Sequence, residues 1–179
     1  MSTLVEHLRA HALHTDGPYT LRSGAVADWY VDARATTFDG AGAAAVADAV
    51  LAVLDPATTA VGGMTMGADP IAVATALEGT RRGRPLRAFS VRKEAKDHGL
   101  GGRIVGPLTD GDRVAVLEDT TTTGSALVEA LDALVDAGIA VVQAIALVDR
   151  SGGAAGERVG ERGVPYAALV RPGDLGVTG

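Results

Sequence analysis

The stretch Val114–Ala126, with the sequence VAVLEDTTTTGSA, is the most informative part of the chain. Its first four residues are all apolar, as expected of a central parallel strand that is covered on both faces. Two acids and four threonines follow, and Gly124 and Ser125 then lead into a segment with leucines at helical spacing. A buried strand, a polar loop and a helix in this order indicate an open α/β sheet with a ligand site at the carboxyl end of the strand.

Strands and helices alternate along most of the chain. Apolar runs bounded by turn residues predict the following strands: 19–21, 29–31, 58–61, 86–91, 114–117 and 141–148. Apolar residues at helical spacing predict the following helices: 3–13, 39–54, one that starts at 69, and 125–135. This alternation predicts a mostly parallel sheet flanked by helices. The length of 179 residues predicts one domain.

The composition is that of a globular protein without disulfides. Hydrophobic residues make up 47% of the chain, and there is no cysteine. The net charge of −6 argues against nucleic acid and anionic membrane surfaces as partners. No apolar run approaches the ~18 residues that a membrane-spanning helix needs. Because the sequence also begins without a signal-peptide pattern, we expect a cytoplasmic protein.

The loop at 120–125 has the chemistry of a phosphate site. At the carboxyl edge of a parallel sheet, the N-terminus of a helix presents unpaired backbone N–H groups to an anion. The threonines add hydroxyl donors, Gly124 lets the backbone approach a ligand closely, and Ser125 is expected to cap the helix. The Walker A pattern is absent, so we expect a tightly held monophosphate and no nucleotide cofactor.

Glu118 and Asp119 stand beside this loop and indicate a sugar phosphate. Carboxylates repel a phosphate, but they accept hydrogen bonds from ribose hydroxyls and assist a hydrated Mg²⁺ ion on a neighbouring group. Direct ligation of the metal by the protein is not expected. The alternative interpretation is a helix-capping turn that carries two solvated acids.

A second candidate site is the polar segment 92–102, RKEAKDHGLGG. The only two lysines of the chain, Lys93 and Lys96, both lie in it. Arg92 and His98 add further donors, and the glycines leave the segment free to close over a ligand. Such a segment suits a highly anionic target, to which Lys96 or His98 can donate a proton. A solvated charged turn is the alternative.

Both segments resemble motifs of one enzyme family. Val114–Ala126 is similar to the ribose-5-phosphate signature of type I phosphoribosyltransferases, which use phosphoribosyl pyrophosphate (PRPP). The segment 92–102 resembles the mobile catalytic loop of orotate phosphoribosyltransferases far more than the loops of purine-using relatives. Further matches are YTLRSG at 19–24, YVDAR at 30–34 and LVDR at 147–150. The resemblance implies the type I phosphoribosyltransferase fold, an α/β fold with a mostly parallel central sheet flanked by helices and a small N-terminal hood at about residues 1–36.

The resemblance also implies a reaction and its residues. The phosphoribosyl group is transferred from PRPP to orotate with the help of Mg²⁺, giving orotidine 5′-monophosphate and pyrophosphate for pyrimidine synthesis. The implied catalytic residues are Lys96, His98 and Asp119. PRPP and pyrophosphate are expected to contact the following residues: Arg92, Lys93, Lys96, His98, Glu118, Asp119, Thr120, Thr121, Thr122, Thr123, Gly124 and Ser125.

Orotate is expected to contact Arg22, Thr122 and Arg150. The loop 92–102 is implied to reach into the partner subunit of a homodimer. One departure from the family pattern lies in the glycine-rich loop 62–67, whose backbone amides are expected to bind pyrophosphate. Many orotate enzymes have a lysine where this loop ends in glycine, at position 67, so one expected pyrophosphate contact is missing.

Two other functions stay open. A type I transferase for another base, such as a purine, would keep the acids and the phosphate loop but should lack RKEAKDHG. A regulator that senses PRPP without catalysis needs only the donor motif, although such proteins usually carry an effector surface or a DNA-binding domain. His7, His11 and His14 lie near one face of the first helix, where we expect a surface helix in preference to a zinc site.

Overall fold

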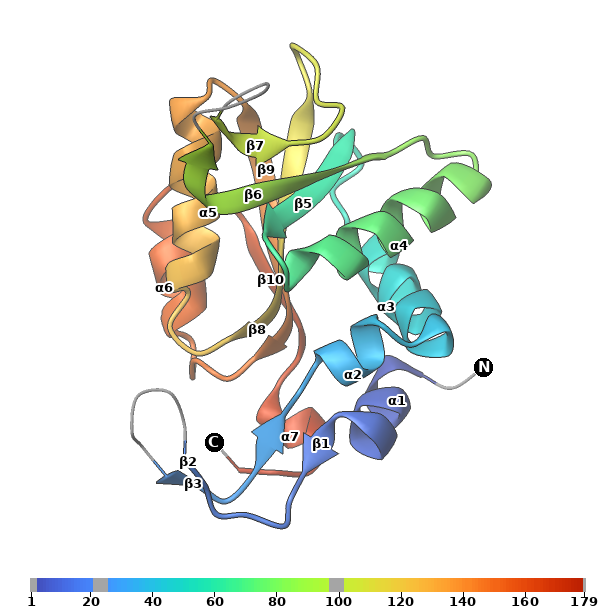
Figure 1. Cartoon of the computed structure of the whole chain (residues 1–179), viewed down its shortest axis with the longest axis vertical. Helices are drawn as coiled ribbons and strands as arrows, with labels where there is room; N and C mark the ends of the chain where they lie inside the picture. The colour runs from blue at the N-terminus through green and yellow to red at the C-terminus, as the bar shows by residue number, and fades with distance from the viewer. Residues whose placement is uncertain (1–2, 21–25, 97–101, 179) are drawn as a thin grey trace.

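Figure 1 shows the computed structural model of the chain, in which residues 3–20, 26–96 and 102–178 are described. A central sheet is formed by the strands β5 Ala60–Met64, β6 Arg87–Lys96, β7 Gly102–Val105, β8 Arg113–Thr121, β9 Ala140–Asp149 and β10 Tyr166–Val170. Their order across the sheet is β10-β9-β8-β5-β6-β7. All neighbours are parallel except β7, which pairs antiparallel with β6. The predicted mostly parallel sheet is confirmed.

Helices cover both faces of this sheet (Figure 1). On one face lie α3 (Gly40–Val53) and α4 (Ala68–Arg81), and on the other lie α5 (Ser125–Asp136) and α6 (Ala154–Gly160). Each pair of helices packs on its face of the sheet and forms a separate cluster of buried apolar side chains with it. Among the described residues, no helix is long and apolar enough to span a membrane.

β8 is buried on both faces, which explains its continuous apolar sequence. Val114 and Val116 belong to the cluster beneath α5, whereas Ala115 and Leu117 belong to the cluster beneath α3 and α4. None of the four is more than 1% exposed. Burial of apolar area contributes ~25 cal/mol per Å², so the strand is fixed from both sides. Its polar end, which starts at Glu118, is thereby held at the carboxyl edge of the sheet.

Small elements gather at this edge, below the sheet in Figure 1. They are α1 Leu4–His11, β1 Leu13–His14, β2 Tyr19–Thr20, β3 Val26–Ala27, β4 Tyr30–Val31, α2 Arg34–Thr37 and α7 Pro172–Leu175. β1 pairs with β4 and β2 with β3, both antiparallel. Leu8 and Val31 belong to the same buried cluster as Leu117 of β8. These N-terminal elements therefore pack directly on the sheet.

Two predicted loops are partly strand. Gly62 and Gly63, predicted in a loop, belong to β5, where Gly62 pairs with both β6 and β8 and Gly63 pairs with β6. A Cβ on either would come within 2.2 Å of the carbonyl oxygen of Phe89 or 2.1 Å of that of Leu117. The glycines are therefore needed because β5 fits closely between its neighbours. The polar segment predicted to start at Arg92 also begins as strand, since β6 continues to Lys96.

The prediction for the first helix is wrong at one histidine. His7 is buried, at 5% exposed, and does not lie on a surface face. Its Nδ1 hydrogen-bonds Thr36 Oγ1 (3.2 Å), and its Nε2 hydrogen-bonds Asp39 Oδ1 (3.0 Å). Asp39 also caps α3 through the backbone N–H groups of Ala41 and Gly42. His7 thus connects α1 to the start of α3.

Candidate active site

The predicted phosphate loop follows β8 and is shorter than expected. The strand runs on through Thr121, so only Thr122, Thr123 and Gly124 separate it from α5. The buried Thr121 Oγ1 accepts a hydrogen bond from the backbone N–H of Gly124 (2.9 Å) and holds the turn closed. Gly124 has a φ of +77°, and a Cβ there would lie 2.8 Å from Ala155 Cα. Glycine is therefore required between this loop and α6.

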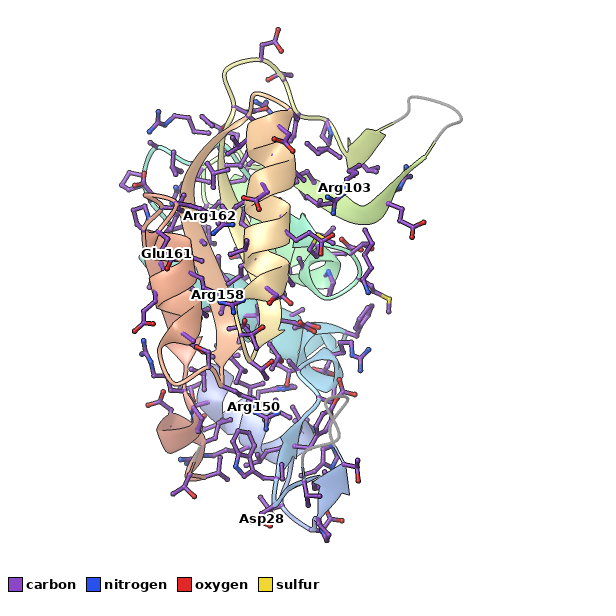
Figure 2. All side chains as sticks on the ribbon, turned by 90° about the vertical axis from the view of Figure 1, so that its left-hand side faces the viewer. Asp28, Arg103, Arg150, Arg158, Glu161 and Arg162 are labelled. Atoms are coloured by element: carbon purple, nitrogen blue, oxygen red, sulfur yellow. The ribbon has the colours of Figure 1, made fainter. Side chains whose placement is uncertain are left out.

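The prediction that the Ser125 side chain caps α5 is wrong. The N-cap is Gly124, which has no side chain to accept from the first N–H groups of the helix. Ser125 is the first helical residue, and its Oγ lies 2.8 Å from Thr123 Oγ1 and accepts a hydrogen bond from Arg158 Nη1 (3.1 Å). Figure 2 shows Arg158 on α6, facing α5. The backbone N–H of Ser125 donates to Thr123 Oγ1 (3.4 Å), and the next N–H groups have no side-chain cap from Gly124, so this helix start is suited to an anion.

Asp119 lies close to the start of α4. Its Oδ1 accepts a hydrogen bond from the backbone N–H of Thr120 (2.7 Å). Burial raises the pKa of Asp119 above its usual value, while this hydrogen bond and the charge of Arg34 oppose the rise. A Cβ at Gly67 would lie 2.6 Å from Asp119 Oδ1. The glycine at position 67 therefore leaves room for this carboxylate.

Glu118 is a half-buried acid with no partner among the described residues. Within the described ranges, no group hydrogen-bonds or ion-pairs with its carboxylate. Burial raises the pKa of Glu118 to about 8, and the charge of Asp119 acts in the same direction. The protonated form of Glu118 is therefore favoured relative to an exposed glutamate, since ionising a half-buried acid without a partner is costly.

Arg150 follows β9 and lies beside the phosphate loop. Its backbone N–H donates to the carbonyl oxygen of Thr121 (2.8 Å), and its guanidinium lies 4.1 Å from the centre of the Trp29 ring. Burial lowers the pKa of Arg150. It forms no ion pair with any described residue, and its buried Nε has no hydrogen-bond partner among them. Such a cation is available to an anionic ligand.

A pocket of about 420 Å³ connects the loop to the N-terminal elements. It is lined by Tyr30, Val31, Asp32, Ala33, Arg34, Asp119, Thr120, Thr122, Thr123 and Arg150. Five residues predicted from the sequence thus meet in one place, namely Asp119, Thr120, Thr122, Thr123 and Arg150. A second pocket of about 440 Å³ lies around the starts of β8 and β9 and contains none of the predicted residues. Ligands of open α/β sheets bind at the carboxyl ends of strands, so the first pocket is the candidate site.

Two predicted residues of the second segment, Arg92 and Lys93, are described, and neither reaches this pocket. Arg92 and Lys93 lie on β6 and do not line it. The carbonyl oxygen of Arg92 accepts a hydrogen bond from Arg103 Nε of the neighbouring β7 (2.8 Å). The side chain of Lys96, and the whole of His98 and Arg22, lie outside the described residues.

Sequence reasoning missed two groups of site residues. Asp32 and Arg34 line the pocket, where Arg34 Nε donates to Asp32 Oδ1 (3.0 Å). Charged residues directly after the short strand at Tyr30 were the available signal, because strand ends form sites in such folds. Arg158 had no comparable signal, since an arginine on a short surface helix is common.

The fold, the pocket and the loop after β8 define a type I phosphoribosyltransferase. The chain is 46% identical over 162 residues to the orotate phosphoribosyltransferase of Streptomyces avermitilis, covering 90% of this chain and 89% of the relative. The crystal structure of Mycobacterium tuberculosis H37Rv orotate phosphoribosyltransferase with Fe(III) dicitrate superposes with a TM-score of 0.83, at 39% identity over 97% of both chains. For the structure of the same M. tuberculosis enzyme in complex with PRPP, the TM-score is 0.78, at 36% identity and 97% coverage of each chain. No protein-family model matches the sequence. This chain belongs to the orotate phosphoribosyltransferase family.

Proposed function

We propose that this phosphoribosyltransferase transfers the phosphoribosyl group of PRPP to N1 of orotate and releases pyrophosphate and orotidine 5′-monophosphate. The observation that carries the proposal is that one pocket joins three kinds of group: threonine hydroxyls at 122 and 123, the Asp119 carboxylate and the Arg150 guanidinium. They suit a phosphate, a ribose and an anionic base, respectively. The PRPP complex of the M. tuberculosis relative supports the choice of donor.

The 5-phosphate of PRPP is assigned to residues 120–125. Thr122, Thr123 and the first N–H groups of α5 supply donors, and Ser125 adds a hydroxyl that already contacts Arg158. Thr121 contributes through the shape of the turn, because its hydroxyl is used by Gly124. The charge of Arg158 near this hydroxyl adds to the attraction for a dianion.

Glu118 and Asp119 are assigned to the ribose hydroxyls and to Mg²⁺. Mg²⁺ prefers oxygen ligands and keeps several of its waters. The two carboxylates fit this chemistry, since Glu118 is unpaired within the described ranges and Asp119 faces the pocket. They would hold the ion through water, with PRPP as its main ligand. The bound ion would neutralise charge on the pyrophosphate.

The transfer breaks the bond between C1 of the ribose and the pyrophosphate oxygen, while N1 of orotate attacks from the opposite face with inversion. N1 loses its proton as its bond to C1 forms, and pyrophosphate gains one. Positive charge grows on the ribose, and the Asp119 carboxylate stabilises it. Arg150 and Thr122 hold orotate, together with Arg22. Arg92, Lys93, Lys96 and His98 neutralise the departing pyrophosphate, with Lys96 or His98 as proton donor, and closure of 92–102 excludes water.

A homodimer is proposed, with the segment 92–102 acting in the partner's site. An apolar surface on α4 supports an interface: Val73 is 60% and Leu77 61% exposed, one helical turn apart. The separately inactive variants Lys96→Ala and Asp119→Asn test this arrangement when they are mixed. Recovery of up to about one quarter of the parent activity is expected, because mixed dimers then contain one complete site. No recovery after subunit exchange would contradict action across subunits.

Residues 1–179 are proposed to act as one phosphoribosyltransferase domain, with the hood at about 1–36. The shared buried cluster of Leu8, Val31 and Leu117 supports this. A cytoplasmic location stays a prediction.

The decisive experiment follows the loss of orotate absorbance with PRPP and Mg²⁺. The intact protein should turn over, and Lys96→Ala should lose at least ~100-fold in kcat, the usual scale for a proton donor. Arg81→Ala, on an exposed side chain at the end of α4, is the matched control and should keep full activity. Turnover with adenine or guanine but not orotate would favour a purine enzyme. PRPP binding without turnover of any base would favour a regulator.

A further inference from the structure

Trp29 and Arg150 form a contact that the transfer reaction, as described above, does not use. The guanidinium of Arg150 lies 4.1 Å from the centre of the Trp29 ring, within the range of a cation–π interaction. Trp29 is 9% exposed and belongs to the buried cluster that joins the N-terminal elements to the sheet. Figure 2 shows Arg150 above these N-terminal elements, where α5 and α6 begin.

The indole is itself held in place. Its Nε1 donates a hydrogen bond of 2.7 Å to the backbone carbonyl oxygen of Thr178. That residue lies near the end of the described chain, just after α7, so Trp29 is fixed between the hood and the C-terminal segment. A ring that is buried and hydrogen-bonded has few orientations, so the guanidinium stacked on it also has few.

The Arg150 guanidinium is held by the aromatic ring of Trp29 and not by a carboxylate, so its positive charge is not neutralised. An aspartate partner would orient the guanidinium but would also neutralise its charge. The face of an aromatic ring orients the planar guanidinium and leaves its N–H donors free for a ligand. Consistent with this, Arg150 has no ion pair with a described residue, and its buried Nε is unpaired among them.

We infer that Trp29 is a positioning residue for the anionic base, which orients the Arg150 guanidinium while preserving its charge. This inference rests on the proposed function, in which Arg150 binds orotate. Trp29 does not line the candidate pocket, and its described contact with a pocket residue of this site is the one with Arg150, so its effect on orotate is expected to pass through Arg150.

The test compares the KM values of the two substrates. Trp29→Leu removes the ring, and the KM for orotate should rise roughly 5- to 30-fold, the scale of a desolvated cation–π contact. The KM for PRPP should stay within about twofold, because Trp29 does not line the pocket that contains the phosphate loop. Trp29→Phe keeps an aromatic face and should recover most of the loss. Thr178→Ala keeps the backbone carbonyl and is the matched control, with no change expected.

A second measurement uses a change of the Trp29 ring that is too small to disturb folding. Trp29 is the only tryptophan of the chain, so growth on 5-fluorotryptophan changes this ring alone. Fluorine weakens the negative potential of the ring face while keeping its shape and N–H, and the KM for orotate should rise about twofold. Unchanged orotate KM values in Trp29→Leu and in the fluorinated protein would overturn the inference, as would an equal rise of both KM values. Absence of orotate turnover in the parent protein would instead refute the proposed function.

Discussion

Glu118→Gln should stabilise the free protein, and only at high pH. The side chain is half-buried beside Asp119, and desolvation raises its pKa from 4.5 to about 8. Below pH 4.5 the acid is protonated in both states and the substitution changes little. Between pH 4.5 and 8 the unfolded chain releases a proton that the folded protein keeps, so stability falls as the pH rises. Above pH 8 the full cost of the buried charge is present.

The magnitude follows from the same pKa values. A tenfold change in an acid equilibrium corresponds to ~1.4 kcal/mol, so the cost above pH 8 is at most ~5 kcal/mol. Partial exposure and relaxation reduce this to ~2–3 kcal/mol. Urea unfolding at pH 5 and pH 8.5 measures it directly: Glu118→Gln should match the parent at pH 5 and exceed it by ~2–3 kcal/mol at pH 8.5.

Glu157→Gln, at an exposed position on α6, is the control and should show no difference at either pH. The reasoning is refuted if Glu118→Gln has the stability of the parent at pH 8.5. A constant gain at both values would also refute it, because the effect would then not come from the charge. The variant should lose affinity for PRPP as it gains stability, since the amide is a weaker acceptor for ribose hydroxyls.

Three further substitutions test other parts of the structure. Asp112→Asn should lower the free energy of unfolding by ~2–3 kcal/mol at pH 7. Burial raises the pKa of Asp112, but its hydrogen bonds to arginine, threonine and backbone groups together lower it below its usual value. The loss of stability should therefore shrink as the pH falls below 3.8. Gly124→Ala should raise the KM for PRPP at least ~10-fold in steady-state assays, because a Cβ would lie 2.8 Å from Ala155 Cα. Gly67→Lys should lower kcat/KM at least ~10-fold by displacing the Asp119 carboxylate, and a gain in activity would contradict the close contact between the two positions.

The sequence was sufficient for the strand, loop and helix around the phosphate site. Apolar residues at Val114–Leu117 and the polar residues after them define a buried strand and its functional end through local pattern alone. The full length of β8 could not be predicted from this local pattern, because the residues from Glu118 to Thr121 adopt strand conformation through their pairing with β9. The same holds for Gly62 and Gly63, whose place in β5 depends on the close approach of β6 and β8.

The site was predicted where one segment carries several functional groups. Asp119 was predicted because it follows a buried apolar strand, whereas Arg150 was predicted from the resemblance of LVDR at 147–150 to the family. The contact of Arg150 with Trp29, and of Gly67 with Asp119, joins residues far apart in the chain, and no spacing in the sequence encodes such contacts. The burial of His7 was missed for a similar reason, since its partners are Thr36 on α2 and Asp39, the residue that caps α3.

The close approach of Gly124 to Ala155 restricts how this protein can diverge over time. Position 155 is fully buried against the turn of the phosphate loop, so a larger side chain there would push the loop away from its ligand. Selection for PRPP binding therefore also restricts which residues are tolerated on α6, although α6 does not line the candidate pocket. We expect small residues at both positions in functional descendants, and an enlargement at 155 should survive only together with a rearranged loop. The two sites should evolve as a pair, although they are thirty-one positions apart in the sequence.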